Sequence, residues 1–242
     1  MSSETVDAAG LTDVGRVREQ NEDAFVLADN VWVVADGLGG HAGGEVASDI
    51  AARTAADVLL AGRGSGHGHG PEQLMVKAFE DAHAAVQAAA AQETGLDDMG
   101  TTLVAGYRDD DGGLHLGSVG DSRAYRLTGT GLEQLTTDDN EAEELVAAGV
   151  ITRAQARVHP GQFSLTKALL AYDLEPPVPR IASIYGPGRL LLCSDGLMAE
   201  LDDQQISRLL AAGAPADAAA SLVQATLEAG ASDNVTVVVV DL

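Results

Sequence analysis

The segment that most restricts the fold is the last one, residues 235–240 (VTVVVV), where nearly every side chain is apolar. A strand that alternates apolar and polar residues can leave one face in water, but a strand that is apolar throughout must be covered on both faces. The chain therefore requires a layered structure in which this strand is enclosed on each side.

Helix-forming segments occur in pairs between groups of strand-forming segments. Apolar residues recur at helical spacing in four segments, residues 45–61, 71–92, 204–212 and 216–229. Short strand patterns occupy residues 24–29, 31–35, 101–107, 114–119, 123–127, 181–185, 189–193 and 235–240. Paired helices between strands favour α+β layers over alternating β–α units. We interpret the three strand patterns between residues 101 and 127 as one antiparallel meander, and residues 138–180 as an irregular excursion over the surface.

The length suits one large domain or two small ones, and the composition suits a substantial core, since 45% of the 242 residues are hydrophobic. The sequence has no long apolar run and no signal-peptide pattern, so we expect a cytoplasmic protein with no membrane partner. A single cysteine, Cys193, excludes an intramolecular disulfide and a multi-cysteine zinc site. The formal net charge of -23 argues against binding to nucleic acid or to an anionic membrane.

The glycine-rich turn after the second predicted strand allows two interpretations. Gly37, Gly39 and Ala42 fit the dinucleotide-binding pattern G-x-G-x-x-G/A, and Asp57 lies at a suitable distance for a ribose contact. In the other interpretation Asp36 is a metal ligand and the glycines only turn the chain. The paired helices weigh against the first interpretation, and Asp36 would face a pyrophosphate as a like charge.

Acidic residues lie at the ends of several predicted strands: Glu22, Asp23, Asp36, Asp121, Asp195 and Asp233. Carboxylates that converge at one edge of a sheet stack raise one another's pKa values unless cations neutralise them. Carboxylate oxygens without a set of cysteines or histidines suit Mg²⁺ or Mn²⁺ better than zinc. Two such ions about 3.5–4 Å apart can activate a water and neutralise the charge that develops during attack on a phosphate. Because a single Asp-Gly pair is usually only a turn, this prediction depends on the fold bringing the acids together.

Six short motifs occur in the order that marks the metal-dependent protein phosphatases of type 2C. They are REQNED (18–23), DGLGGH (36–41), GTT (100–102), GDSR (120–123), SDG (194–196) and SDN (232–234). Each motif alone is weak, but together they make residues 11–242 resemble this family in its bacterial form. The resemblance implies an α+β fold, a four-layer αββα sandwich of two central antiparallel sheets flanked by helix pairs. It also implies one catalytic domain over residues 1–242, with residues 138–180 as a flap-like excursion.

The resemblance implies a binuclear Mn²⁺ or Mg²⁺ centre. Asp36 would bridge both ions, and the carbonyl of Gly37 would bind the second one. Asp195 and Asp233 would hold the first ion. Asp121, together with Asp195, would contribute to a weaker third site.

Other family positions surround these ligands. Glu22 and Asp23 would support the second ion directly or through waters, and Arg18 would bind the substrate phosphate through two hydrogen bonds. Some family members place a histidine directly after the Asp-Gly pair, where this chain has Leu38. His41, three residues later, is a candidate general acid, and a metal-bound water is the alternative proton donor.

The excursion departs from the family pattern in its return to the core. Gln162 and Phe163 stand where relatives have a basic residue and an asparagine, which leaves substrate specificity and the third metal open.

The implied activity is hydrolysis of phosphoserine and phosphothreonine in proteins by direct attack of a metal-bridging water or hydroxide. The expected partners are phosphoprotein substrates and an opposing serine/threonine kinase, and we expect a monomer. The alternative is a catalytically silent relative that binds phosphoproteins. Such a relative would be expected to lack Asp36, Asp195 or Asp233, and all three are present. The negative charge predicts a preference for phosphorylation sites flanked by Lys or Arg.

Overall fold

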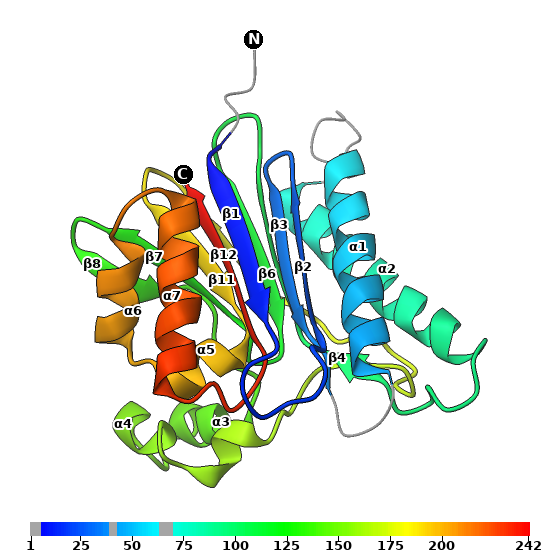
Figure 1. Cartoon of the computed structure of the whole chain (residues 1–242). Coiled ribbons are helices and arrows are strands. Elements are labelled where there is room, and N and C mark those ends of the chain that lie inside the picture. Colours follow the sequence, from blue (N-terminus) through cyan, green and yellow to red (C-terminus); the bar gives the residue numbers. More distant parts are fainter. Residues whose placement is uncertain (1–5, 39–42, 63–69) are drawn as a thin grey trace.

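Two five-stranded antiparallel sheets lie face to face in the computed structural model of the chain, which describes residues 6–38, 43–62 and 70–242 (Figure 1). The first, here the β12 sheet, contains in order β1 (Ala8–Asp13), β12 (Val235–Asp241), β11 (Arg189–Cys193), β7 (Arg123–Thr128) and β8 (Gly131–Gln134). The second, the β3 sheet, contains in order β10 (Arg180–Ile184), β6 (Leu114–Val119), β5 (Leu103–Arg108), β3 (Val31–Asp36) and β2 (Asp23–Ala28). A short third sheet pairs β4 (Gly100–Thr101) with β9 (Leu169–Leu170).

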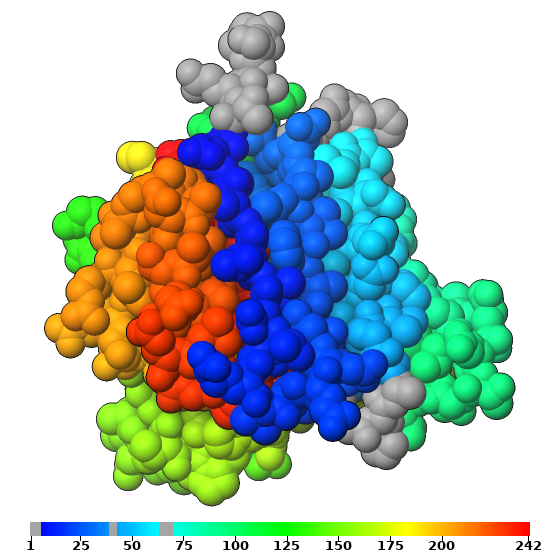
Figure 2. Space-filling view, in the orientation of Figure 1, coloured from blue at the N-terminus to red at the C-terminus, as the bar shows by residue number. Residues whose placement is uncertain are grey.

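Helices cover the outer face of each large sheet, so the predicted αββα sandwich is confirmed (Figure 1). The helices on the β3 sheet are α1 (Gly44–Gly62) and α2 (Pro71–Ala90). Those on the β12 sheet are α5 (Asp195–Glu200), α6 (Asp203–Leu210) and α7 (Pro215–Ala229). The excursion at residues 138–180 carries α3 (Glu141–Ala147), α4 (Arg153–Ala156) and the 3₁₀ helix η1 (Pro160–Phe163). In Figure 2 its yellow-green residues form the lower edge of the molecule, below the orange and red helices.

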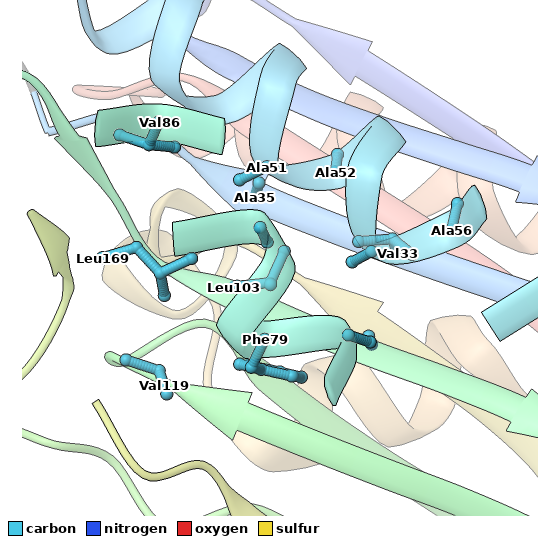
Figure 3. Close-up of a cluster of buried hydrophobic side chains, with 14 of the residues drawn as sticks. Val33, Ala35, Ala51, Ala52, Ala56, Phe79, Val86, Leu103, Val119 and Leu169 are labelled. Atoms are coloured by element: carbon cyan, nitrogen blue, oxygen red, sulfur yellow. The ribbon is translucent and has the colours of Figure 1, made fainter. Parts of the chain in front are cut away.

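The core consists of three apolar layers, and β12 belongs to two of them. Val238 and Val240 face the β3 sheet, where they pack with Trp32, whereas Val237 and Val239 face α5–α7. This strand is therefore buried on both faces, as its composition predicts. The layer under α1 and α2 contains small, aliphatic and aromatic side chains, among them those of Ala51, Ala52, Ala56, Phe79 and Val86 (Figure 3).

The predicted meander is wrong at its third strand. β5 and β6 form a hairpin, but β7 pairs with β11 and β8 in the other sheet. The turn at Gly120–Ser122 therefore carries the chain from one sheet to the other. Gly120 makes the crossing with φ +97°, a conformation that residues with a side chain rarely adopt. The crossing places Asp121 at the junction between the sheets.

Most other predicted elements are confirmed, with small shifts at their ends. β6 and β11 have the predicted bounds, whereas the strand predicted at residues 101–107 is divided between β4 and β5 at Thr102. β1, β8 and α5 have no counterpart in the prediction. Both neighbours of β3 are antiparallel to it, which rules out the parallel β–α–β unit of a dinucleotide-binding fold. In the described part of the chain, no helix combines the length and apolar character that a bilayer crossing requires.

Replacing Gly120 tests the crossing. A Cβ atom here would lie 2.7 Å from Cβ of the buried Thr102, in addition to the strain of the positive φ. We expect Gly120→Ala to lower the free energy of unfolding by about 2–4 kcal/mol, measured by urea denaturation. Gly129→Ala is the matched control, because a Cβ there meets no atom within 4 Å. Equal stability of the two variants would contradict this account of the turn.

Candidate metal centre

The β3 sheet contributes two facing aspartates. Asp36 is the last residue of β3 and Asp23 the first of β2, and the two are directly opposite in the antiparallel register. Cross-strand neighbours have Cβ atoms about 5 Å apart, so two like charges meet at this edge of the sheet.

The β12 sheet contributes three more aspartates at the same edge. Asp195 follows β11 and begins α5, Asp233 lies two residues before β12, and Asp121 lies in the crossing turn before β7. These strand ends lie together near the lower end of the sandwich in Figure 1. The fold therefore brings the predicted acids together, which the sequence alone left open.

The shifts in pKa show how strongly these carboxyl groups interact. Burial raises the pKa of Asp36 well above its usual range, and the charges of Asp23, Asp195, Asp121 and Asp233 raise it further, in that order. All five aspartates thus belong to one electrostatic cluster, which we call the aspartate cluster.

The neighbours of Asp36 are shifted in the same direction. Burial raises the pKa of Asp23 to about 6, against hydrogen bonds that lower it. Burial, followed by the charge of Asp195, raises the pKa of Asp121 to about 8. The pKa of Asp195 is raised by burial and by Asp233, while a hydrogen bond with Asp36 opposes the shift. A divalent cation bound among these carboxyl groups would favour their charged forms and so lower these pKa values.

The oxygen atoms of the cluster suit a hard cation. Oδ2 of Asp23 accepts a hydrogen bond from Oγ of Ser194 at 2.7 Å, but its buried Oδ1 has no hydrogen-bond partner. Glu22, whose pKa is raised by burial and by Glu45, adds a further carboxyl group beside Asp23. An oxygen-only donor set of this kind fits Mn²⁺ or Mg²⁺.

Among residues 6–38, 43–62 and 70–242, no three acidic or histidine side chains already surround one point as ligands of a single ion. One acid of the cluster already has a cationic partner, since Nη2 of Arg18 lies 2.7 Å from Oδ2 of Asp233. The Arg18 side chain is 46% exposed, so it can exchange this partner for another anion. Complete coordination would therefore need small side-chain movements and water ligands, which Mg²⁺-type ions commonly keep.

Two threonines hold the backbone of Asp36. Oγ1 of Thr101 donates to the carbonyl oxygen of Asp36 at 2.9 Å, and the Asp36 amide donates to Oγ1 of Thr102 at 3.1 Å. The Thr102 hydroxyl also shares a hydrogen bond of 2.7 Å with Oγ of Ser122, next to Asp121. The GTT motif thus ties the Asp36 turn to the crossing turn.

Asn234 lies in the SDN motif, but the motif alone predicts no role for it. Its Nδ2 donates to the carbonyl oxygens of Val14 and Gln20 at 2.9 Å each, and its Oδ1 accepts from the amide of Glu22 at 2.9 Å. It therefore fixes the loop that carries Arg18. The signal for this role was the motif itself, but the contacts span more than 200 residues and needed the fold.

The remaining predicted residues fall into three groups. Gly37 lies beside the cluster, and its amide donates to the carbonyl oxygen of Glu22 at 3.1 Å. Gln162 and Phe163 lie on η1, away from the cluster but along a cleft that leads to it. His41 lies outside the described residues, so its predicted role as a general acid stays a prediction.

Comparisons with known proteins agree with this geometry. A family model described as "Protein phosphatase 2C" matches residues 16–230. The serine/threonine protein phosphatase PstP of Mycobacterium tuberculosis is 36% identical over 241 residues, which are 97% of this chain but 44% of that protein. The chain thus spans less than half the length of this relative. The serine/threonine phosphatase stp of Listeria monocytogenes is 32% identical over 95% of this chain and 93% of its own length.

A solved structure extends the likeness to three dimensions. The catalytic domain of PstP, in complex with 2 manganese ions, superposes with a TM-score of 0.84 at 34% sequence identity. The superposition covers 98% of this chain and 97% of that one.

The raised pKa values predict how stability depends on pH in the absence of metal. Because the pKa values of Asp23 and Asp121 in the folded protein, about 6 and about 8, lie above that of an unfolded aspartate, the folded protein binds more protons between about pH 4 and pH 8. In EDTA the free energy of unfolding should therefore fall as the pH rises from 5 to 8, by up to about 1.4 kcal/mol per pH unit for each contributing group, Asp23 contributing up to about pH 6 and Asp121 up to about pH 8.

Urea denaturation at several pH values measures this fall. Saturating Mn²⁺ should remove most of it, and Asp121→Asn should reduce it between pH 6 and pH 8. Asp57→Asn, an exposed position on α1, should leave it unchanged. Stability that rises over this range in EDTA would contradict the proposed repulsion.

Proposed function

The chain belongs to the protein phosphatase 2C family, and we propose that it is a protein serine/threonine phosphatase that requires Mn²⁺ or Mg²⁺. The observation that carries this proposal is the aspartate cluster, to which both sheets contribute and beside which an exposed arginine lies. Named protein phosphatases among the relatives support the activity. The proposal treats residues 1–242 as one catalytic domain, with the excursion as a flap beside the site.

The residues present fit a binuclear centre. Asp36 would bridge two ions, with Asp195 and Asp233 on the first and the carbonyl oxygen of Gly37 on the second. Unmatched negative charge and the unpartnered oxygen of Asp23 support this assignment. When bound, the ions lower the pKa of a water and neutralise charge that develops on the phosphate.

Two further acids would lie around this pair of ions. Glu22 lies beside Asp23, and both would support the second ion directly or through waters. Asp121 is buried against Asp195 and would contribute to a weaker third site.

Arg18 provides the binding group for the phosphate. Its guanidinium group is planar and presents parallel donors that match two phosphate oxygens. In the structure one of these donors binds Asp233, whose carboxylate is also a proposed metal ligand. Binding of a cation to Asp233 would weaken this ion pair and release Arg18 toward the substrate. The ion pair between Arg18 and Asp233 thus couples metal binding to phosphate binding.

The chain's partners follow from this activity. The substrates would be phosphoproteins, and the enzyme would oppose a serine/threonine kinase while acting as a monomer. We also propose a cytoplasmic location, which is compatible with the finding that no helix in the described residues could cross a membrane.

Phosphate release from a phosphothreonine peptide tests the proposed activity. Turnover should require Mn²⁺ or Mg²⁺ and stop in excess EDTA. Asp36→Asn keeps the size of the side chain but removes the bridging charge, and we expect it to lower kcat by about 10³-fold or more. Asp57→Asn is the control, because it removes the same charge from an exposed position on α1. A folded wild type that binds Mn²⁺ but releases no phosphate from varied phosphopeptides would favour the phosphoprotein-binding alternative.

A second set of variants tests Arg18. Because Arg18 would bind the phosphate through charge-assisted hydrogen bonds, we expect Arg18→Ala to lower kcat/KM by about 10- to 100-fold. Its affinity for Mn²⁺, measured by calorimetry, should not fall, since Asp233 loses a competing partner. Arg16→Ala is the matched control in the same loop, where the side chain binds only the Leu227 carbonyl oxygen among the described contacts. Equal kinetics for the two variants would exclude the phosphate role.

A further inference from the structure

A cleft of about 970 Å³ leads away from the aspartate cluster between the excursion and the β12 sheet's helices. Asp121 and Asp195 line the end nearest the cluster. One wall is formed by α3, α4 and η1 of the excursion, and the other by α5 and the first turn of α6. Figure 1 shows α3 and α4 directly below α5 and α6. A segment of substrate that leaves the phosphorylated residue in this direction would lie between the two walls.

The lining of the cleft is acidic. It contains seven carboxylates and three guanidinium groups. Every one of these guanidinium groups is paired with a carboxylate of the same lining: Arg123 with Asp138, Arg153 with Glu143, and Arg157 with Asp203. The positive charges of the lining are therefore already neutralised, and negative charge is left over.

The surplus negative charge includes two carboxylates near the α5–α6 junction. Oε1 of Glu200 accepts only from the amide and hydroxyl of Ser232, at 3.0 and 2.9 Å. Asp202 is the N-cap residue of α6, and its Oδ1 accepts a hydrogen bond from the amide of Gln205 at 2.8 Å. Neither carboxylate has an ion-pair partner among the described residues, unlike the carboxylates that pair with Arg123, Arg153 and Arg157.

Apolar side chains lie beside this charge. Leu135 and Met198 line the cleft, and Phe163 stands at its side with 74% of its surface exposed. An apolar lining next to unpaired carboxylates matches the side chains of Lys and Arg, which have an aliphatic stem and a cationic end.

We propose that this cleft binds the segment on one side of the phosphorylated residue and selects Lys or Arg in it. The inference rests on the proposed phosphatase function, because it assigns the cleft to that function's substrate. A preference set by the cleft differs from a general effect of the net charge of -23, because the net charge would favour basic residues on either side of the phosphorylated residue. The cleft leads away from the cluster in one direction, so it requires a one-sided preference.

A peptide series separates the two explanations. A phosphothreonine peptide with alanine at the flanking positions is compared with peptides that carry one arginine at each position in turn, on both sides. We expect arginine on one side to raise kcat/KM about two- to fivefold, the size expected of one partly exposed ion pair, and arginine on the other side to have less effect. An equal preference on both sides would overturn the inference.

Asp202→Asn locates the preference in the cleft. Asparagine caps a helix as well as aspartate does, so α6 should remain intact while the charge is lost. The variant should lose most of the arginine preference and keep its kcat/KM for the alanine peptide. Asp217→Asn is the matched control, because Asp217 lies in the first turn of α7, is exposed and does not line the cleft. A full preference retained in Asp202→Asn would overturn the inference.

Binding of the same peptides to the Asp36→Asn variant, measured by fluorescence anisotropy, reports the preference without turnover. One-sided binding together with an inactive wild type would support the proposed role of the cleft and contradict the proposed phosphatase activity. Turnover without a one-sided preference would support the phosphatase activity and contradict the proposed role of the cleft.

Discussion

Repulsion among the five carboxyl groups of the aspartate cluster is the constraint on which the rest of the structure depends. Burial and neighbouring charge raise the pKa values of Asp36, Asp121 and Asp195 together, so the folded chain gathers groups that would separate in water. Such a cluster opposes folding unless protons or cations compensate it. The same repulsion favours the binding of divalent ions. The site therefore lowers the stability of the metal-free fold at the edge of the sandwich where function requires it.

The two packed sheets hold the repelling groups in place. Layers of buried apolar side chains on both faces of β12 and β3 fix the strand ends, and short polar contacts fix the turns between them. The hydroxyls of Thr102 and Ser122 join the turns of Asp36 and Asp121, while Asn234 secures the loop of Arg18. Both sheets must be formed before the cluster exists, because each contributes only part of it. The site is therefore a property of the whole sandwich, and the cleft beside it extends the same acidic field toward the excursion.

The sequence predicted the features that depend on neighbouring residues better than those that depend on contacts between distant segments. Apolar runs such as those of β6 and β11 predicted their own bounds, and the order of the motifs indicated the proposed ligands before any contact was known. The third strand of the meander was misassigned because Gly120-Asp121-Ser122 has the composition of a hairpin turn, and its partner strand, β11, lies some 70 residues away in the chain. The pair between Arg18 and Asp233 and the walls of the cleft are contacts between distant segments, which periodicity cannot reveal.

A crystal structure of the protein grown with Mn²⁺ and recorded at the manganese absorption edge tests the central claim most directly. The account predicts two anomalous peaks about 3.5–4 Å apart that share a carboxylate oxygen of Asp36, with Asp195 and Asp233 on one of them. It also predicts that Arg18 no longer contacts Asp233. Anomalous peaks elsewhere, or a single ion that does not touch Asp36, would contradict it.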